Sequence, residues 1–207
     1  LFLLELTGDP EPHLAVLDDE ERARAQRYLF PRHRRRFVIC HAEVRRLLAA
    51  RTGTNPETLR FERGPQGKPS LPDHPNLHFN LSHSGELALL GISDRELGVD
   101  LEWMKPTRAG TRIAERYFSP RECEQFHTFP ESERARVFHR FWSCKEAYIK
   151  AIGLGLSAGL DSFDVELDGT GGSFLGRTSP DPTARDRWRL FELDVHVEFA
   201  AAMVVAT

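Results

Sequence analysis

Two acidic residues, Asp100 and Glu102, alternate with apolar residues in the segment ELGVDLEWMKP, residues 96–106. This alternation predicts a half-buried strand, on which side chains two residues apart share a face. Two carboxylates on one face repel each other unless a positive charge lies between them. Mg²⁺, which binds one or two carboxylates together with phosphate oxygens, would remove this repulsion. A solvated polar face is the alternative explanation of the pair.

A second polar group lies on the segment FHRFWSCKEAYIKAIGLG, residues 138–155. Apolar residues recur there at steps of three, four and seven, which predicts an amphipathic helix. Trp142, Glu146 and Lys150 follow one another at i, i+4 and i+8 and therefore form one stripe along that helix. Gly153 and Gly155 are expected to end it, because glycine tolerates the left-handed C-cap conformation. The alternative is a solvated Glu–Lys pair beside a core tryptophan.

Together, the two segments resemble the paired signatures of the 4′-phosphopantetheinyl transferases, with GVDLE at residues 98–102 and WSCKEAYIK at residues 142–150. Two further stretches, GKPSLPDHPNLHFNLSHSG at residues 67–85 and FSPRE at residues 118–122, resemble the larger, Sfp-type (surfactin-synthetase-activating) branch of that family. The resemblance covers roughly residues 18–167 and is weak in the first and last stretches of the chain.

The resemblance implies a Mg²⁺-dependent transferase that moves 4′-phosphopantetheine from coenzyme A to a serine of an apo acyl or peptidyl carrier protein, releasing adenosine 3′,5′-bisphosphate. Asp100, Glu102 and Glu146 would hold Mg²⁺ against the pyrophosphate of coenzyme A, and Asp100 would also contact the coenzyme. Glu146 is the candidate base for the serine proton, directly or through water. Lys150 would offset charge on the pyrophosphate as the nucleotide leaves. The resemblance also implies a monomer.

Further coenzyme contacts are implied by matching positions: Lys68 in GKP, Ser82 and His83 in NLSHSG, Glu122 in FSPRE, and Trp142 beside the pantetheine arm. Each has a structural alternative, such as a loop lysine, a turn or a core tryptophan. The carrier protein is expected to dock near the helices of residues 112–129.

One departure from the family concerns the first helix, where the branch often carries two basic residues that bind the 3′-phosphate. The matching positions here are Glu21 and Arg24. The acid puts the first contact in doubt. Arg22, Arg24 or the arginines of residues 34–36 are the candidates to supply the missing charge.

The bulk properties are those of a water-soluble globular chain: 207 residues, 40% hydrophobic, 29% charged, net charge −3. This charge gives no electrostatic case for nucleic-acid binding. The three cysteines have no disulfide or metal-ligand spacing, which favours the cytoplasm. The apolar start LFLLEL is too short for a signal segment, and no apolar run approaches the length of a membrane span.

The order of expected elements is strand, helices and antiparallel strands, then the same again, which predicts an α+β fold. The halves are expected at residues 1–97, carrying phosphate contacts, and 98–207, carrying the acids and the catalytic helix. Their pseudo-symmetry, with the coenzyme in the cleft between them, is implied by the resemblance. Helices are expected from Asp18 or Asp19 to residue 30 and at residues 31–52, 112–118, 120–126 and 130–152, the last capped by Ser132. Strands are expected at residues 2–6, 59–63, 77–81, 86–92, 98–102, 163–167, 173–177, 188–193 and 199–205. A turn is expected at SHSG, residues 82–85.

Two other function classes share parts of this pattern. A metal-dependent phosphodiesterase or nuclease also uses two nearby acids and a distant glutamate, but it requires a basic groove that the net charge argues against. A non-catalytic coenzyme A or carrier-binding scaffold would have a broken set of acids, whereas Asp100, Glu102, Glu146 and Lys150 are all present. A hydrolase built on Ser82 and His83 is excluded, since no G-x-S-x-G elbow surrounds them.

Overall fold

The computed structural model describes residues 1–105, 109–155, 159–168, 172–179 and 181–207. The N-terminal part contains β1 (Phe2–Glu5), a 3-10 turn (Glu11–Val16), α1 (Asp19–Gln26), α2 (Pro31–Thr52), β2 (Glu62–Arg63), β3 (Pro69–Ser70), β4 (His78–Ser84) and β5 (Leu87–Ser93). The C-terminal part contains β6 (Leu97–Trp103), α3 (Ala109–Tyr117), α4 (Pro120–Thr128), α5 (Glu131–Ile152), β7 (Phe163–Leu167), β8 (Ser173–Thr178), α6 (Ala184–Arg187), β9 (Trp188–Glu192) and β10 (Phe199–Ala206).

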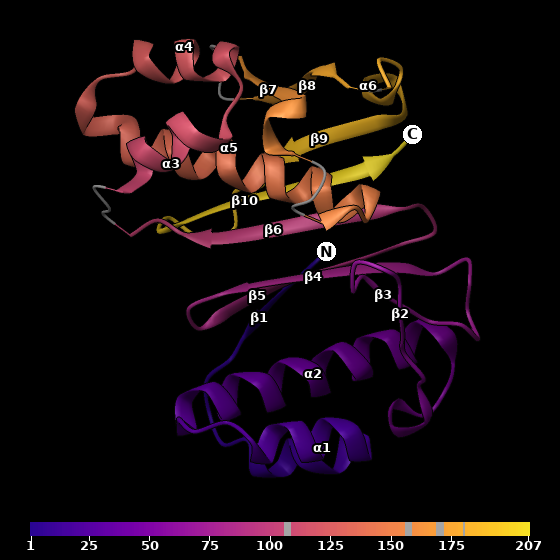
Figure 1. Cartoon of the computed structure of the whole chain (residues 1–207). Coiled ribbons are helices and arrows are strands. Elements are labelled where there is room, and N and C mark those ends of the chain that lie inside the picture. Colours follow the sequence, from indigo (N-terminus) through magenta and orange to yellow (C-terminus); the bar gives the residue numbers. More distant parts are fainter. Residues whose placement is uncertain (106–108, 156–158, 169–171, 180) are drawn as a thin grey trace.

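The strands form two three-stranded antiparallel sheets, ordered β1-β5-β4 and β6-β10-β9, and two short ribbons, β2-β3 and β7-β8. Helix α2 covers the first sheet and α5 covers the second, so the sheets lie between two layers of helices (Figure 1). This arrangement confirms the α+β prediction with antiparallel sheets. Strand β5 ends at Ser93 and β6 begins at Leu97; the division of the chain into halves at residue 97 stays a prediction.

The ends of the long helices follow from local chemistry. Asp18 caps α1 and shares a capping box with Glu21, which satisfies two free backbone N–H groups. Helices α2 and α5 both end at a glycine in the left-handed conformation, Gly53 and Gly153, each with φ of 70°. Among the described residues, none of the helices is both long enough and apolar enough to cross a lipid bilayer.

Four local predictions are corrected. Helix α5 begins after Pro130, which provides no side-chain cap, so Ser132 does not cap it. Strand β4 continues to Ser84, so residues 82–84 belong to the strand and not to a turn. The strand expected at residues 59–63 is only two residues long. The four-residue helix α6 was not predicted; its length leaves too little periodicity to detect.

Three small polar side chains of β4 join the two sheets. Asn80 Oδ1 accepts a hydrogen bond from the backbone N–H of Val99 at 2.8 Å, and Ser84 Oγ accepts one from Trp103 N–H at 3.0 Å. Between them, Ser82 Oγ donates to Asp100 Oδ1 at 2.9 Å. Side chains of β4 thus accept hydrogen bonds from backbone N–H groups of β6, and the hydrogen bond from Ser82 holds Asp100 where the two sheets meet.

Helix α5 lies directly on β6 at Gly98. A Cβ atom at Gly98 would lie 2.1 Å from the carbonyl oxygen of Ala147 and 2.3 Å from the nitrogen of Ala151. Only glycine permits this approach, which brings the polar stripe of α5 close to the acids of β6.

Candidate active site

The two acids of β6 lie opposite small residues of the neighbouring strand. Asp100 pairs with Ala202 and Glu102 with Ala200 in the antiparallel register of β6 and β10. Asp100 is only 2% exposed, whereas Glu102 is half-buried. Because alternate strand residues share a face, both carboxylates lie on the face of β6 that α5 covers.

Lys150 and Ser82 meet at one oxygen of Asp100. The Lys150 ammonium donates to Asp100 Oδ1 at 2.5 Å and to Ser82 Oγ at 2.9 Å. The other oxygen, Asp100 Oδ2, is buried and has no hydrogen-bond partner within the described part of the chain. A buried carboxylate oxygen without a partner is costly, so this atom is a position where a further cation would stabilise the protein.

Glu102 and Glu146 complete an acidic group around that position. Burial and the charge of Asp100 raise the pKa of Glu102 to about 7; Glu146 adds to this rise, while Lys150 and a hydrogen bond from Trp142 oppose it. Burial and Asp100 likewise raise the pKa of Glu146, against Lys150. Repulsion between the acids thus contributes to both raised pKa values, with burial as the larger cause.

No group of three or more His, Cys, Asp or Glu side chains is close enough to hold a metal ion in the ranges that the structure describes. The ammonium of Lys150 is the cation that contacts Asp100 here. The predicted ligand set of Asp100, Glu102 and Glu146 thus stays a prediction. The partnerless Asp100 Oδ2 and the two raised carboxyl pKa values nevertheless describe an excess of negative charge that suits a hard cation.

Trp142 contacts both the core and the acids. Its ring stacks on Phe138 with centroids 5.7 Å apart and meets Tyr117 edge-on at 6.1 Å. A hydrogen bond from Trp142 also lowers the pKa of the Glu102 carboxyl, against its burial. Trp142 therefore packs in the aromatic core, and its contact with the pantetheine arm stays a prediction.

His83 and Arg24 line a cavity of about 340 Å³ in the N-terminal part, together with Glu21 and His41. Burial and the charge of Lys150 lower the pKa of His83, and the charges of His41 and Arg36 contribute. Strand β4 places Ser82 and His83 on opposite faces. Ser82 consequently meets the acids, while His83 opens into this cavity.

Lys68 does not reach this cavity or the acids through its hydrogen bonds. Its ammonium donates to the carbonyl oxygens of Leu97 at 3.1 Å and Ala151 at 2.7 Å. Burial lowers its pKa, against the charge of Glu96. Carbonyls at a helix C-terminus attract cations, so Lys68 links the β2–β3 loop to the end of α5, and its expected phosphate contact stays a prediction.

Glu122 also lies apart from the other predicted residues. It forms a capping box with Ser119, and its Oε1 accepts hydrogen bonds from Lys145 Nζ at 2.5 Å and Val165 N–H at 2.7 Å. Glu122 is 1% exposed and the Lys145 side chain is fully buried. With both oxygens engaged in the interior, Glu122 forms a buried ion pair with Lys145, and its expected contact with the coenzyme stays a prediction.

Sequence reasoning missed three residues that support the site. Asn80 and Ser84 flank Ser82 at steps of two on β4, so a polar face on an otherwise apolar strand was the available signal. Lys145 lies on the apolar side of α5 between buried residues. A lysine at such a position indicates a buried acid partner, because an unpaired buried ammonium is strongly unfavourable.

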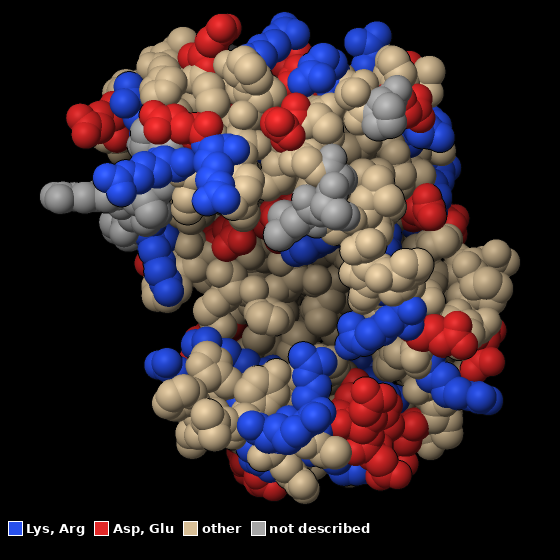
Figure 2. Space-filling view, in the orientation of Figure 1, with Lys and Arg blue, Asp and Glu red and all other residues tan. Residues whose placement is uncertain are grey.

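Space-filling atoms show that the face seen in Figure 1 is hollowed between its upper, C-terminal part and its lower, N-terminal part (Figure 2). Lys and Arg side chains gather along the lower edge of this hollow. Predicted site residues come from both parts, with Ser82 and His83 below and Asp100, Glu146 and Lys150 above.

Comparisons with known proteins give a consistent result. The family model described as the 4′-phosphopantetheinyl transferase superfamily matches residues 96–204, and the model for the N-terminal part of 4′-phosphopantetheinyl transferases matches residues 10–94. The chain is 39% identical over 196 residues to the 4′-phosphopantetheinyl transferase HetI of Nostoc sp., an alignment covering 93% of this chain and 79% of HetI. It is 32% identical over 157 residues to the 4′-phosphopantetheinyl transferase Sfp of Bacillus subtilis, covering 76% of this chain and 69% of Sfp.

Among solved structures, a holo-(acyl-carrier-protein) synthase from Bacillus anthracis aligns with a TM-score of 0.43 and 23% identity, over 54% of this chain and 94% of that one.

Proposed function

Because the chain belongs to the 4′-phosphopantetheinyl transferase superfamily, we propose that it transfers the 4′-phosphopantetheine group of coenzyme A to a serine hydroxyl of an apo carrier protein. The serine oxygen forms a bond to the phosphorus that carries pantetheine. The bond from that phosphorus to the bridging oxygen breaks, and adenosine 3′,5′-bisphosphate leaves. The serine proton passes to a base on the enzyme.

The observation that carries the proposal is the meeting of Ser82, Asp100 and Lys150 beside Glu102 and Glu146. Phosphoryl transfer requires positioned charges and little covalent chemistry from the protein. A buried acid with a partnerless oxygen, two acids of raised pKa and one ammonium provide such charges where α5 crosses β6.

The residues present fit a bound Mg²⁺. Asp100, through its partnerless Oδ2, would hold the ion together with Glu102 and Glu146, which are the hard oxygen ligands that Mg²⁺ prefers. When bound, Mg²⁺ would offset the charge of the coenzyme's pyrophosphate. Lys150 is then available to the phosphate oxygens, since its present partner Asp100 would share its charge with the ion.

Glu146 is the proposed base for the serine proton. Its pKa is raised by burial and by Asp100, which makes the carboxylate a stronger proton acceptor than an exposed glutamate. The charge of Lys150, one helical turn away, opposes this rise. Lys150 also lies where it can donate to the departing oxygen.

The partner is proposed to be an acyl or peptidyl carrier protein, docking near the helices α3 and α4. Since residues of both parts of one chain line the site, we propose that a monomer is sufficient for activity. The three cysteines are free, which fits a reducing, cytoplasmic setting.

The direct test is mass spectrometry of an apo carrier protein incubated with this protein, coenzyme A and Mg²⁺. A mass increase equal to one phosphopantetheine group on the carrier serine is expected, together with adenosine 3′,5′-bisphosphate in equal amount. A carrier Ser→Ala variant is the control. Absence of transfer to carriers of both the acyl and peptidyl classes would refute the proposal.

A further inference from the structure

The acid at position 21 has a structural explanation. Glu21 completes the capping box with Asp18, and its Oε2 accepts a hydrogen bond from Arg45 Nε at 2.6 Å. Its Oε1 lies 2.7 Å from His41 Nδ1. Although burial alone would raise the pKa of Glu21, the hydrogen bonds from His41 and Arg45 lower it. The carboxylate is therefore charged, and it anchors His41.

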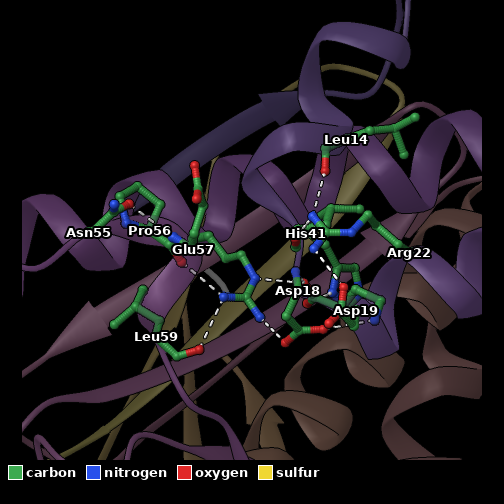
Figure 3. A network of polar contacts seen from close by, with 12 residues as sticks. Leu14, Asp18, Asp19, Arg22, His41, Asn55, Pro56, Glu57 and Leu59 are labelled. Atoms are coloured by element: carbon green, nitrogen blue, oxygen red, sulfur yellow. Dashed lines mark hydrogen bonds and ion pairs between the residues drawn. The ribbon is translucent and has the colours of Figure 1, made fainter.

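Arg45 neutralises the acids on this side of the cavity. Its side chain is fully buried and binds Asp18 as well as Glu21, and it also donates to the carbonyl oxygens of Pro56 and Leu59. Figure 3 shows this network, with Asp18 and His41 on one side of it and Pro56 and Leu59 on the other. The negative charges of Asp18 and Glu21 are thus offset by Arg45, while a third acid, Glu20, also lines the cavity.

The anchor also determines which nitrogen of His41 remains for a ligand. A charged carboxylate accepts hydrogen bonds and cannot donate one, so His41 Nδ1 must carry the proton in that contact. The ring is held further by Phe37, whose centroid is 4.1 Å away. Nε2 is left as the nitrogen that can meet a ligand in the cavity that His41 lines.

Most of the alternative arginines are engaged elsewhere. Arg22 contacts the carbonyl oxygens of Leu14 and Leu17 and pairs with Asp19. The arginines of residues 34–36 bind two acids outside the cavity lining, Glu11 and Glu86.

Arg24 differs from them. It lines the cavity, and its guanidinium lies over the ring of Phe37 at 5.0 Å. No acid partner of Arg24 is found among the described residues. Arg24, His41 and His83 thus line this cavity together with a further arginine, Arg63, whose guanidinium donates to the carbonyl oxygen of Gly67.

We infer that His41 binds the 3′-phosphate of coenzyme A together with Arg24 and His83, and that Glu21 is the positioning residue of His41. The histidine on α2 replaces the basic side chain that the family often has at position 21. Burial is the larger cause of the lowered His83 pKa, and the charges of Lys150, His41 and Arg36 add to it, which is consistent with positive potential at this place. The inference rests on the proposed use of coenzyme A and adds the residues that discriminate its 3′-phosphate.

The first experiment compares coenzyme A with dephospho-coenzyme A as donors for the wild type and for His41→Gln, which keeps a polar side chain but cannot become cationic. A lost charge-assisted hydrogen bond lowers affinity roughly 10- to 100-fold. We expect KM for coenzyme A to rise by this factor with kcat unchanged, and the constants for dephospho-coenzyme A to stay within about twofold. His33→Gln, at a half-buried histidine of the same helix that does not line the cavity, is the matched control.

The second experiment measures binding without turnover, by titrating adenosine 3′,5′-bisphosphate and AMP into each variant. Glu21→Gln keeps the length of the side chain but loses its charge, so we expect a loss of discrimination in the same direction as His41→Gln and smaller in size. Equal losses for both nucleotides, or unchanged discrimination in His41→Gln, would overturn the inference. If the wild type distinguished the nucleotides but transferred nothing, the proposed function would fail while the inference stood.

Discussion

The two long helices of the molecule are built alike. Helices α2 and α5 each have 22 residues and end at a left-handed glycine, Gly53 or Gly153. Arg45 and Lys145 lie at the same distance from the first residue of their helices, and both side chains are fully buried. The two halves thus place one buried cation at corresponding points.

Each buried cation also has corresponding partners. Arg45 binds Glu21, the acid of the α1 capping box, and Lys145 binds Glu122, the acid of the α4 capping box. Each also donates to a main-chain carbonyl beyond its own helix, Leu59 or Phe163. This shared clamp gives physical support to the pseudo-symmetry that the family resemblance implied.

The halves differ in the stripe that faces the acids of β6. At the positions of α2 that correspond to Trp142, Glu146 and Lys150, the sequence has Ala42, Arg46 and Ala50. The buried ion pair is therefore common to both helices, whereas the three side chains to which the proposed chemistry is assigned occur on the second helix and not at the matching positions of the first.

The largest effect is expected from removing one buried cation. In Lys145→Met, Glu122 is left buried without its partner, which costs about 3–5 kcal/mol. For a chain of this length the melting temperature should fall by roughly 6–20 °C. The double variant Lys145→Met/Glu122→Gln removes both charges and should recover part of the loss. An unchanged melting temperature in Lys145→Met would contradict a stabilising role of the buried Lys145–Glu122 ion pair.

The acids should matter to transfer and not to folding. Asp100→Ala, Glu102→Ala and Glu146→Ala should each lower kcat roughly 100- to 1,000-fold, as removal of a main transition-state contact does. Arg46→Ala, the counterpart of Glu146 in α2, is the matched control and should keep activity. A near-wild-type rate in one of the three acid variants would remove that acid from the mechanism. Wild-type transfer that EDTA leaves undiminished would remove the metal.

The two ligands should stabilise the fold jointly. Mg²⁺ and coenzyme A share the proposed site, so each should tighten the other by the same factor. At about 100-fold over its dissociation constant a ligand adds about 2.7 kcal/mol to the free energy of unfolding. Thermal melts with Mg²⁺, coenzyme A and both should show a combined shift larger than the sum. Strictly additive shifts would mean independent sites.

Mg²⁺ binding should depend on pH through Glu102. Its carboxyl pKa of about 7 means that below pH 7 the group is mostly protonated and neutral, and a protonated carboxyl must lose its proton to bind a cation. From pH 8 to pH 6 the apparent affinity for Mg²⁺ should fall about tenfold. Calorimetric titration of the wild type and Glu102→Gln checks this; an equal pH dependence in both would assign the effect to another group.

The smallest effect is expected from the tether between the halves. Lys68→Met should lower stability by about 1 kcal/mol, since two carbonyls lose a donor. It should weaken coenzyme A and dephospho-coenzyme A equally, because Lys68 holds the end of α5 and contacts no other site residue. A selective loss for coenzyme A would instead restore the phosphate contact expected from the family motif.

Helix ends could be predicted from the sequence, whereas the interaction partners of charged side chains could not. Gly53 and Gly153 marked helix ends because glycine at a C-cap is a local signal, and Asp18 marked a helix start for the same reason. The cap at Ser132 was wrong because Pro130 admits the helix two residues earlier. Lys68 and Glu122 were predicted as site residues from their places in family motifs. Their partners in the structure come from segments that are distant in the chain. No periodicity in the sequence encodes such contacts.

Within the site, the spacing of Asp100 and Glu102 on β6 and of Glu146 and Lys150 on α5 was enough to predict which faces they share. The direct contact between Lys150 and Asp100 required the crossing of α5 over β6, which tertiary packing determines. The contact between His41 and Glu21 likewise required the packing of α2 against α1, and Arg45 on the next turn of α2 binds the same carboxylate.

The close approach at Gly98 has an evolutionary consequence. Even the smallest substitution, to alanine, places a carbon 2.1 Å from the Ala147 carbonyl oxygen, so helix α5 would have to lift off the strand. Glu146 and Lys150 would move with it, away from Asp100. No other residue type at position 98 therefore preserves the site. We expect selection to conserve this glycine as strictly as the acids Asp100, Glu102 and Glu146.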